Sequence, residues 1–416
     1  MPLEHSIIRR SAGVTTAFLI GHAFNYALYW GADRILDPGR FGLFYTAVVS
    51  IGIAMSPMIA VTLVLARRFA AIAVREGHEA VAAATRWVLA SCARACFGVL
   101  IFSVLLAAAA PFIGIESWQV AFFIPLTVLA SVIVEIERSA LQGMLLFARS
   151  STLWIANTGA QFAFSLGALY LFSAVWTGIV GLLIGAAGAA AVFAPWFFRS
   201  KQRRTPARPI LPLLTQDAPF IISYSLFVLF NNLDILAAYW LLPRIELGMY
   251  TASALLPKAI VTATFAIAQV VLPVLTARRT GGLPLGRTLI KGVGLTLGIA
   301  SGAVVLLLLG VPWLQSTPLA IRGLNLELMH ILALGAVAFC ALRVLVVIEV
   351  ALQQYAIGIA QAGAIVAFAL LCTRSPANPV RVAELFVLVG VAFVLLAGTA
   401  AIAFHWRQSA LKIVPD

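Results

Sequence analysis

Apolar residues gather in long runs along this chain, and short clusters of charged residues separate one run from the next. Each run is long enough for an α-helix to cross the hydrocarbon core of a bilayer, which takes about 20 residues. The alternation of polar and apolar residues that marks a spanning β-strand does not occur. The pattern predicts an all-α integral membrane protein with about twelve transmembrane helices, at residues 11–30, 41–66, 81–110, 118–137, 151–173, 176–198, 218–241, 247–276, 288–313, 327–350, 353–373 and 382–405.

The composition excludes a soluble globular protein. Apolar residues make up 62% of the 416 residues and charged residues only 10%, whereas about 25% of the residues in soluble domains are charged. The formal net charge is +13. A cytoplasmic N-terminus places eighteen Lys and Arg residues in inside segments and six in outside loops, as the positive-inside rule requires. We therefore expect both termini in the cytoplasm, and the basic excess does not indicate nucleic acid as a partner.

An internal repeat divides the chain at its longest polar break, where basic residues alternate with prolines between 199 and 217. Short patterns recur in the same order on both sides, at offsets near 210. They pair Tyr29-Trp30 with Tyr239-Trp240, Phe41-Gly42-Leu43-Phe44 with Leu247-Gly248-Met249-Tyr250, Arg67-Arg68 with Arg278-Arg279, and Ala140-Leu141-Gln142 with Ala351-Leu352-Gln353. We expect pseudo-symmetric six-helix bundles at 1–198 and 218–405, a cytoplasmic linker at 199–217 and a cytoplasmic tail at 406–416. Such paired halves are typical of transporters that open one half against the other.

No residue pattern for catalysis is present. The four cysteines lie in or beside apolar runs without the His or carboxylate spacing of a metal site, and we interpret them as packing residues. The chain has no phosphate-binding loop, no HExxH motif and no polar segment long enough to fold as an ATPase. We therefore expect no enzyme activity, no metal and no cofactor. An ion gradient, the gradient of the substrate or a partner would supply the energy.

Three cations fall deep inside the expected spans: Arg94, Lys258 and Arg343. A charge at the centre of a membrane helix costs about 2.5–3.5 kcal/mol on insertion scales, so such residues indicate function. Several cations around one hydrated cavity would attract an anion. We expect these three residues to form a cationic substrate-binding cavity between the halves. The alternative is internal ion pairing, of Lys258 with Asp234 or of Arg343 with Glu349.

Other polar residues at similar depths suggest two further roles. His22, Asn25, Asn157 and Gln161 are candidates for contacts with sugar hydroxyls, and Asn231, Asn232 and Asp234 are candidates for ion coupling. Hydrogen bonds that hold neighbouring helices together are the alternative for both groups. We interpret Glu135, Glu137 and Arg138 as a solvated helix end, and Arg86 as a side chain that extends to the membrane surface.

Four of these segments resemble a known family. They are Tyr29-Trp30, the turn Asp37-Pro38-Gly39-Arg40-Phe41-Gly42-Leu43-Phe44, the pair Arg67-Arg68 and the segment Arg138-Ser139-Ala140-Leu141-Gln142-Gly143. Together they are similar to bacterial polysaccharide biosynthesis proteins of the Wzx type. These proteins are oligosaccharide-lipid flippases of the multidrug/oligosaccharidyl-lipid/polysaccharide (MOP) exporter superfamily.

The resemblance implies a pair of six-helix bundles of the MOP or MATE type, which move an undecaprenyl-pyrophosphate-linked oligosaccharide across the bacterial inner membrane by alternating access. It implies a lipid-linked oligosaccharide and membrane lipids as partners, with a glycan polymerase or another assembly protein as a further candidate. A multidrug extruder of the same superfamily is the first alternative, although it would favour a carboxylate-rich cavity. A membrane glycan polymerase or ligase is the second, although it usually needs a long outside loop.

Overall fold

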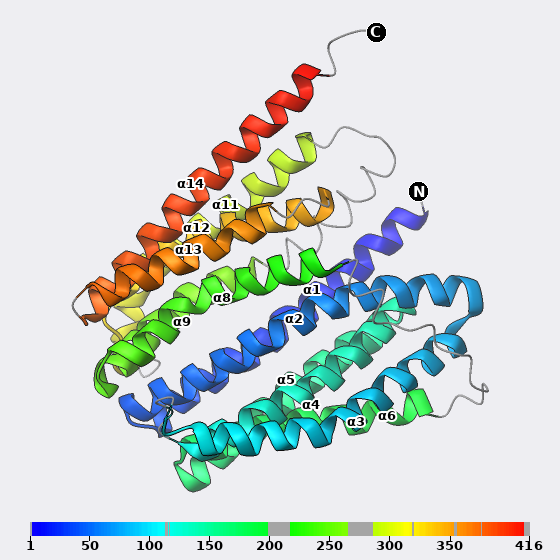
Figure 1. Ribbon diagram of the computed structural model, residues 1–416, viewed down its shortest axis with the longest axis horizontal. Helices are drawn as coiled ribbons and strands as arrows, with labels where there is room; N and C mark the ends of the chain where they lie inside the picture. The colour runs from blue at the N-terminus through cyan, green and yellow to red at the C-terminus, as the bar shows by residue number, and fades with distance from the viewer. Residues whose placement is uncertain are drawn as a thin grey trace. The chain divides into compact units, whose positions relative to one another are not determined.

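The computed structural model describes residues 2–112, 115, 117–198, 217–264, 286–317, 320–352, 356–375 and 377–411. Within these residues the chain forms twelve helices and no strand (Figure 1). Their bounds are α1 Pro2–Ile35, α2 Pro38–Glu76, α3 His78–Ala109, α4 Trp118–Gly143, α5 Phe147–Phe172, α6 Val175–Phe198, α8 Ala218–Leu241, α9 Arg244–Ala263, α11 Gly286–Gln315, α12 Leu326–Leu352, α13 Ala356–Thr373 and α14 Pro379–Leu411. The predicted all-α membrane fold is confirmed.

Nine of the helices in this described part are long and apolar enough to cross a membrane; α1, α5 and α9 do not meet the same criterion. Every predicted span corresponds to one helix. The predicted linker lies outside the described residues except for Asp217, and so do residues 265–285, which hold the end of the span predicted at 247–276. The linker and the domain boundaries drawn from it stay predictions.

Local sequence sets the ends of several helices. At the start of α2, the Asp37 carboxylate accepts a hydrogen bond of 2.9 Å from the backbone N–H of Arg40, and Pro38 occupies the first helical turn, where no N–H is needed. Ser117 caps α4 by accepting from the N–H of Val120. Ser173 ends α5 in the left-handed conformation, with a φ of 50°. These polar turns separate helices that are otherwise apolar throughout.

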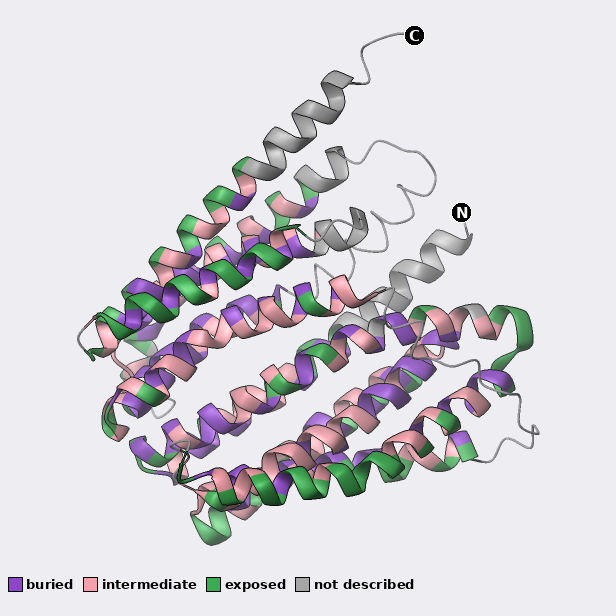
Figure 2. Ribbon diagram, viewed as in Figure 1, coloured by how far each residue is buried: buried purple, intermediate pink, exposed green. Residues whose placement is uncertain are grey.

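The chain divides into two compact units, residues 1–228 with 243–251 and residues 229–242 with 252–416. In the first unit, α4 is the central helix and packs against α2, α3, α5 and α6. A core of buried apolar residues fills the end of these helices near Gly143, with Phe69, Val81, Leu141 and Phe197 among its members. Figure 2 shows that α3, by contrast, is exposed along much of its length.

Two glycines of the predicted repeat pack directly against each other within the first unit. A Cβ atom added to Gly42 would lie 2.9 Å from the backbone N of Gly248, and one added to Gly248 would overlap the carbonyl of Pro38. The backbones of α2 and α9 can approach this closely only because neither position carries a side chain. The segments that matched in sequence therefore also meet in space.

In the second unit, α12 is the central helix and packs against α11, α13 and α14. Aromatic rings hold this packing together. The rings of Phe339 on α12 and Phe386 on α14 stack at 4.6 Å between centroids, and Phe230 on α8 and Phe368 on α13 meet them edge-on. Phe339 and Phe386 of this aromatic core also line a pocket that contains Asp234 and Lys258.

Candidate functional site

A small pocket lies in the second unit between α8, α9, α12 and α14. Its polar lining comes from α8 and α9, and its apolar lining from α12 and α14. The lining residues are Asn231, Asp234, Ala254, Pro257, Lys258, Val261, Leu332, Ala336, Phe339 and Phe386. Two of the residues that the sequence singled out for chemistry, Lys258 and Asp234, thus share one pocket.

Lys258 and Asp234 form an ion pair in this pocket, with 2.9 Å between Nζ and Oδ1. The ammonium also donates to the backbone carbonyl of Asn231 at 2.5 Å and lies 5.4 Å from the centre of the Phe386 ring. All three contacts favour a charged ammonium. The alternative that the sequence left open for Lys258, an internal pair with Asp234, is confirmed.

The two members of the pair differ in exposure. The Asp234 side chain is 0% exposed, whereas the Lys258 side chain is 12% exposed. Both residues line the pocket, and Lys258 is the more exposed of the two. A ligand in the pocket meets a cation whose charge the neighbouring carboxylate partly compensates.

Pro257 lies within α9 beside the pocket. Proline has no backbone N–H, so it cannot donate to the carbonyl of Ser253 one turn earlier. Lys258 follows directly after this proline.

Arg343 on α12 reaches the same part of α9. Its Nη1 donates to the carbonyl of Val261 at 2.5 Å, and Val261 is a pocket residue one turn after Lys258. The structure therefore brings two of the three predicted cations to neighbouring turns of α9. The Glu349 side chain, the other partner that the sequence suggested for Arg343, lies outside the described residues.

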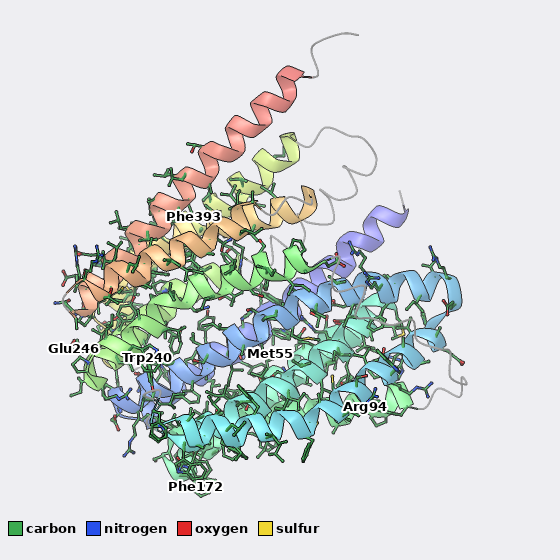
Figure 3. The ribbon with its side chains drawn as sticks, in the orientation of Figure 1. Met55, Arg94, Phe172, Trp240, Glu246 and Phe393 are labelled. Atoms are coloured by element: carbon green, nitrogen blue, oxygen red, sulfur yellow. The ribbon has the colours of Figure 1, made fainter. Side chains whose placement is uncertain are left out.

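Arg94 lies in the other unit, on the exposed face of α3 (Figure 3). Its guanidinium donates to Ser91 and to the carbonyl of Ala90, both on its own helix. These contacts direct the side chain toward the start of α3, which the predicted topology places in the cytoplasm. A cavity shared by Arg94, Lys258 and Arg343 stays a prediction.

The length of α3 bears on the predicted depth of Arg94. α3 has 32 residues and so is about 48 Å long, more than the ~30 Å of hydrocarbon. Arg94 is about 22 Å along the helix from Ala109. Its depth in the membrane stays a prediction.

The polar candidates of the first unit lie at the contact between α1 and α5. The His22 ring on α1 meets the Phe18 ring edge-on, with 4.2 Å between the ring centroids. Its centroid lies 6.1 Å from that of the Trp154 ring on α5. Asn157 is buried, and its Oδ1 has no hydrogen-bond partner in the described part of the protein. Asn25 and Gln161 are half-buried on the same two helices. Sugar contacts by these four residues stay a prediction.

The coupling candidates lie together on α8. The Asn231 carbonyl and the Asp234 carboxylate accept hydrogen bonds from the Lys258 ammonium. Asn232, the residue after Asn231, is half-buried. Binding of a coupling ion by Asn231, Asn232 and Asp234 stays a prediction. The ammonium of Lys258 already gives Asp234 a neighbouring positive charge.

Sequence reasoning was wrong about the end of α4. Glu135 is buried and accepts two hydrogen bonds from Arg138, whose guanidinium lies 4.8 Å from the centre of the Trp154 ring. Glu137 is 0% exposed, and neither of its carboxylate oxygens has a hydrogen-bond partner in the described part of the chain. These residues are enclosed by neighbouring helices rather than solvated.

No protein-family model and no curated protein sequence matches the chain. Solved structures of membrane transporters match nearly all of it. A crystal structure of MATE in the straight conformation aligns with a TM-score of 0.69 and 14% identity, over 98% of this chain and 96% of that one. A MOP superfamily transporter from Pyrococcus furiosus, described by the reverse polarity of its binding pocket, aligns with a TM-score of 0.70 and 13% identity, over 98% and 96%.

A structure of the lipid II flippase MurJ in an inward closed conformation aligns with a TM-score of 0.68 and 13% identity, over 95% of this chain and 87% of that one. The chain therefore has the fold of MOP superfamily transporters. At these identities the likeness establishes the fold and leaves the substrate to be argued from the site. Flippases and multidrug transporters both occur among the similar structures.

Proposed function

We propose that this protein is a flippase of the MOP superfamily. It moves an undecaprenyl-pyrophosphate-linked oligosaccharide or a related glycolipid across the bacterial inner membrane, by alternating access and without enzymatic chemistry. The fold shared with the lipid II flippase supports a transporter of lipid-linked glycans. The resemblance of the Pro38–Phe44 turn to Wzx proteins supports an oligosaccharide as the cargo.

The observation that carries the proposal is the unequal exposure of the two charged residues that line the pocket of the second unit. The Lys258 side chain is 12% exposed, whereas that of Asp234 is 0% exposed. A pocket whose more exposed charged residue is a cation favours an anionic group such as a pyrophosphate over a cationic drug. A cation extruder would favour the reverse, with the carboxylate as the more exposed of the two.

Transport by the purified protein tests this proposal. Liposomes that contain the protein and a fluorescent undecaprenyl-pyrophosphate oligosaccharide are expected to expose the glycan to an added glycosidase faster than empty liposomes. Lys258→Met should reduce the rate at least about tenfold, because a point charge that contacts phosphate contributes more than about 1.4 kcal/mol. The matched control is Lys291→Met, which removes an exposed lysine of α11.

The alternative function is multidrug export, which the MATE structures suggest. A deletion strain separates the two functions. Loss of surface glycan with unchanged drug susceptibility supports the flippase, and raised susceptibility to cationic drugs with a normal glycan profile contradicts it.

A further inference from the structure

Glu137 of α4 is the unusual ionisable group of the first unit. Its side chain is 0% exposed, and within the described residues both carboxylate oxygens lack a hydrogen-bond partner. Among the carboxylates whose side chains the structure describes, no other has both oxygens buried and unpartnered. A buried ionised carboxylate without any partner is the costliest state for such a group, so its charge must be removed or compensated.

The surroundings of Glu137 are apolar. Its helical neighbours Val134, Ala140 and Leu141 belong to the buried core that α4 forms with α2, α3 and α6. α6 contributes no ionisable residue to this core. The core therefore provides no compensating charge from that side.

The charged groups of the other helices around α4 are engaged elsewhere or lie beyond hydrogen-bond reach of Glu137. On α2, Arg67 and Arg68 pair with Asp217. On α5, the Arg149 guanidinium lies over the Trp196 ring, and on α4 itself Arg138 binds Glu135. On α3, His78 and Glu79 are exposed, and Cys92 and Arg86 are half-buried. None of these groups donates a hydrogen bond to a Glu137 oxygen.

The same surroundings favour a proton over a metal cation as the ligand that neutralises the Glu137 carboxylate. A hard cation such as Na⁺ or Ca²⁺ needs several oxygen ligands, and Ca²⁺ takes about six to eight. In the described part of the chain no group of three or more His, Cys, Asp or Glu residues could hold a metal ion. A proton needs one oxygen, and it makes the carboxyl neutral without any other partner.

The position of Glu137 suits exchange with the cytoplasm. It is nineteen residues into α4, so it lies about 28 Å from the outer end of the helix at Trp118. This is close to the ~30 Å thickness of the hydrocarbon core, so Glu137 is near the cytoplasmic boundary of the membrane. Only the packing of the surrounding helices separates it from cytoplasmic water.

We propose that Glu137 is a proton-binding site of the transport cycle. Its carboxyl is protonated while it is enclosed as in this structure. When the helices around it part, the O–H bond breaks, the proton passes to cytoplasmic water and the carboxylate becomes hydrated. Return to the enclosed state requires a proton again, so a pH gradient biases the cycle. The coupling step rests on the proposed transport function, whereas the binding of a proton does not.

Two readouts on the purified full chain test the proposal, with Glu137→Gln as the variant and Glu79→Gln, an exposed carboxylate of α3, as its matched control. Infrared spectroscopy at neutral pH should detect the C=O band of a protonated carboxyl in the wild type and the control, and no such band in the variant. The flipping rate in liposomes should respond to an imposed pH gradient in the wild type and the control, and this response should be lost in the variant. An imposed sodium gradient should change nothing.

The two readouts separate the two hypotheses. A band that persists in Glu137→Gln, or is absent from the wild type, overturns the proton site. Wild-type flipping that is indifferent to pH, or that follows sodium instead, overturns the coupling. If the wild type moves no lipid-linked glycan under any condition, the proposed function fails, while the infrared result still decides the proton site. Should the Gln variant not insert, Glu137→Met matches the apolar core and gives the same readouts.

Discussion

Neutralising either member of the ion pair between Asp234 and Lys258 should destabilise the second unit. Asp234→Asn leaves the ammonium with only the Asn231 carbonyl and the Phe386 ring. Lys258→Met leaves a carboxylate that is 0% exposed without its cation. Removal of one partner from a buried pair costs about 3–5 kcal/mol, because the other charge remains buried and uncompensated. We expect Lys258→Met to be the more harmful change, because the charge it leaves unpaired belongs to a side chain that is 0% exposed, whereas the Lys258 side chain is 12% exposed.

The double variant should recover most of this loss. Asn and Met are neutral and close in size to the residues they replace, and a neutral pair leaves no buried charge. The interaction term of the double-mutant cycle should therefore be about 3 kcal/mol or more, which is large for two residues in contact. Thermal or detergent-induced unfolding of the purified variants measures the cycle, with Lys291→Met as the control for a lysine lost from an exposed position.

The reasoning would be refuted if the double variant lost about the sum of the two single losses. Flipping then separates structure from function. If the pair only fixes the bundle, the double variant should be both stable and active. If Lys258 also binds the anionic part of the substrate, the double variant should be stable but inactive, and we expect this second outcome.

Three further predictions concern other parts of the chain. A reporter fused after Lys201 should be active only in the cytoplasm; activity in the periplasm contradicts the predicted topology. Arg94→Ala should leave thermal stability within about 0.5 kcal/mol, because the side chain is exposed, and should abolish export of surface glycan; normal glycan in this strain removes Arg94 from the substrate path. Gly248→Ala should destabilise the protein by about 1–3 kcal/mol, because the new Cβ overlaps the Pro38 carbonyl, whereas Gly298→Ala, where nothing lies within reach, should be neutral; equal melting temperatures contradict the close helix contact.

The order and number of helices could be predicted because lipid imposes one simple rule, a long apolar run for each crossing. The ends could not be predicted by that rule. α2 continues from the expected end at residue 66 to Glu76, and α4 from residue 137 to Gly143. These extensions pack against one another through residues such as Phe69 of α2 and Leu141 and Gly143 of α4, so tertiary contacts and not lipid stabilise them.

The same limit explains which site residues could be found. Lys258 and Asp234 were predictable because both charges fall inside apolar runs on consecutive helices. Glu137 was misjudged because its depth was measured against the membrane alone. Its side chain is 0% exposed although it falls at the expected end of the span. The apolar residues Leu141 and Met144, beyond the expected end of the span, were the available signal for this burial.

The buried carboxylates of the two units, Asp234 and Glu137, differ in whether a cation is paired with them, and this difference has a mechanistic consequence. In the second unit, Asp234 is paired with Lys258, whose Nζ lies 2.9 Å from its Oδ1. In the first unit, Glu137 has no hydrogen-bond partner among the described residues, so a proton is what makes it neutral, and its charge depends on access to water. A transporter can use both arrangements, a paired charge at a binding site and a carboxyl whose charge changes when the protein opens. Their separation onto different units would let the proton gradient act on the cycle without altering the affinity of the pocket for its anion.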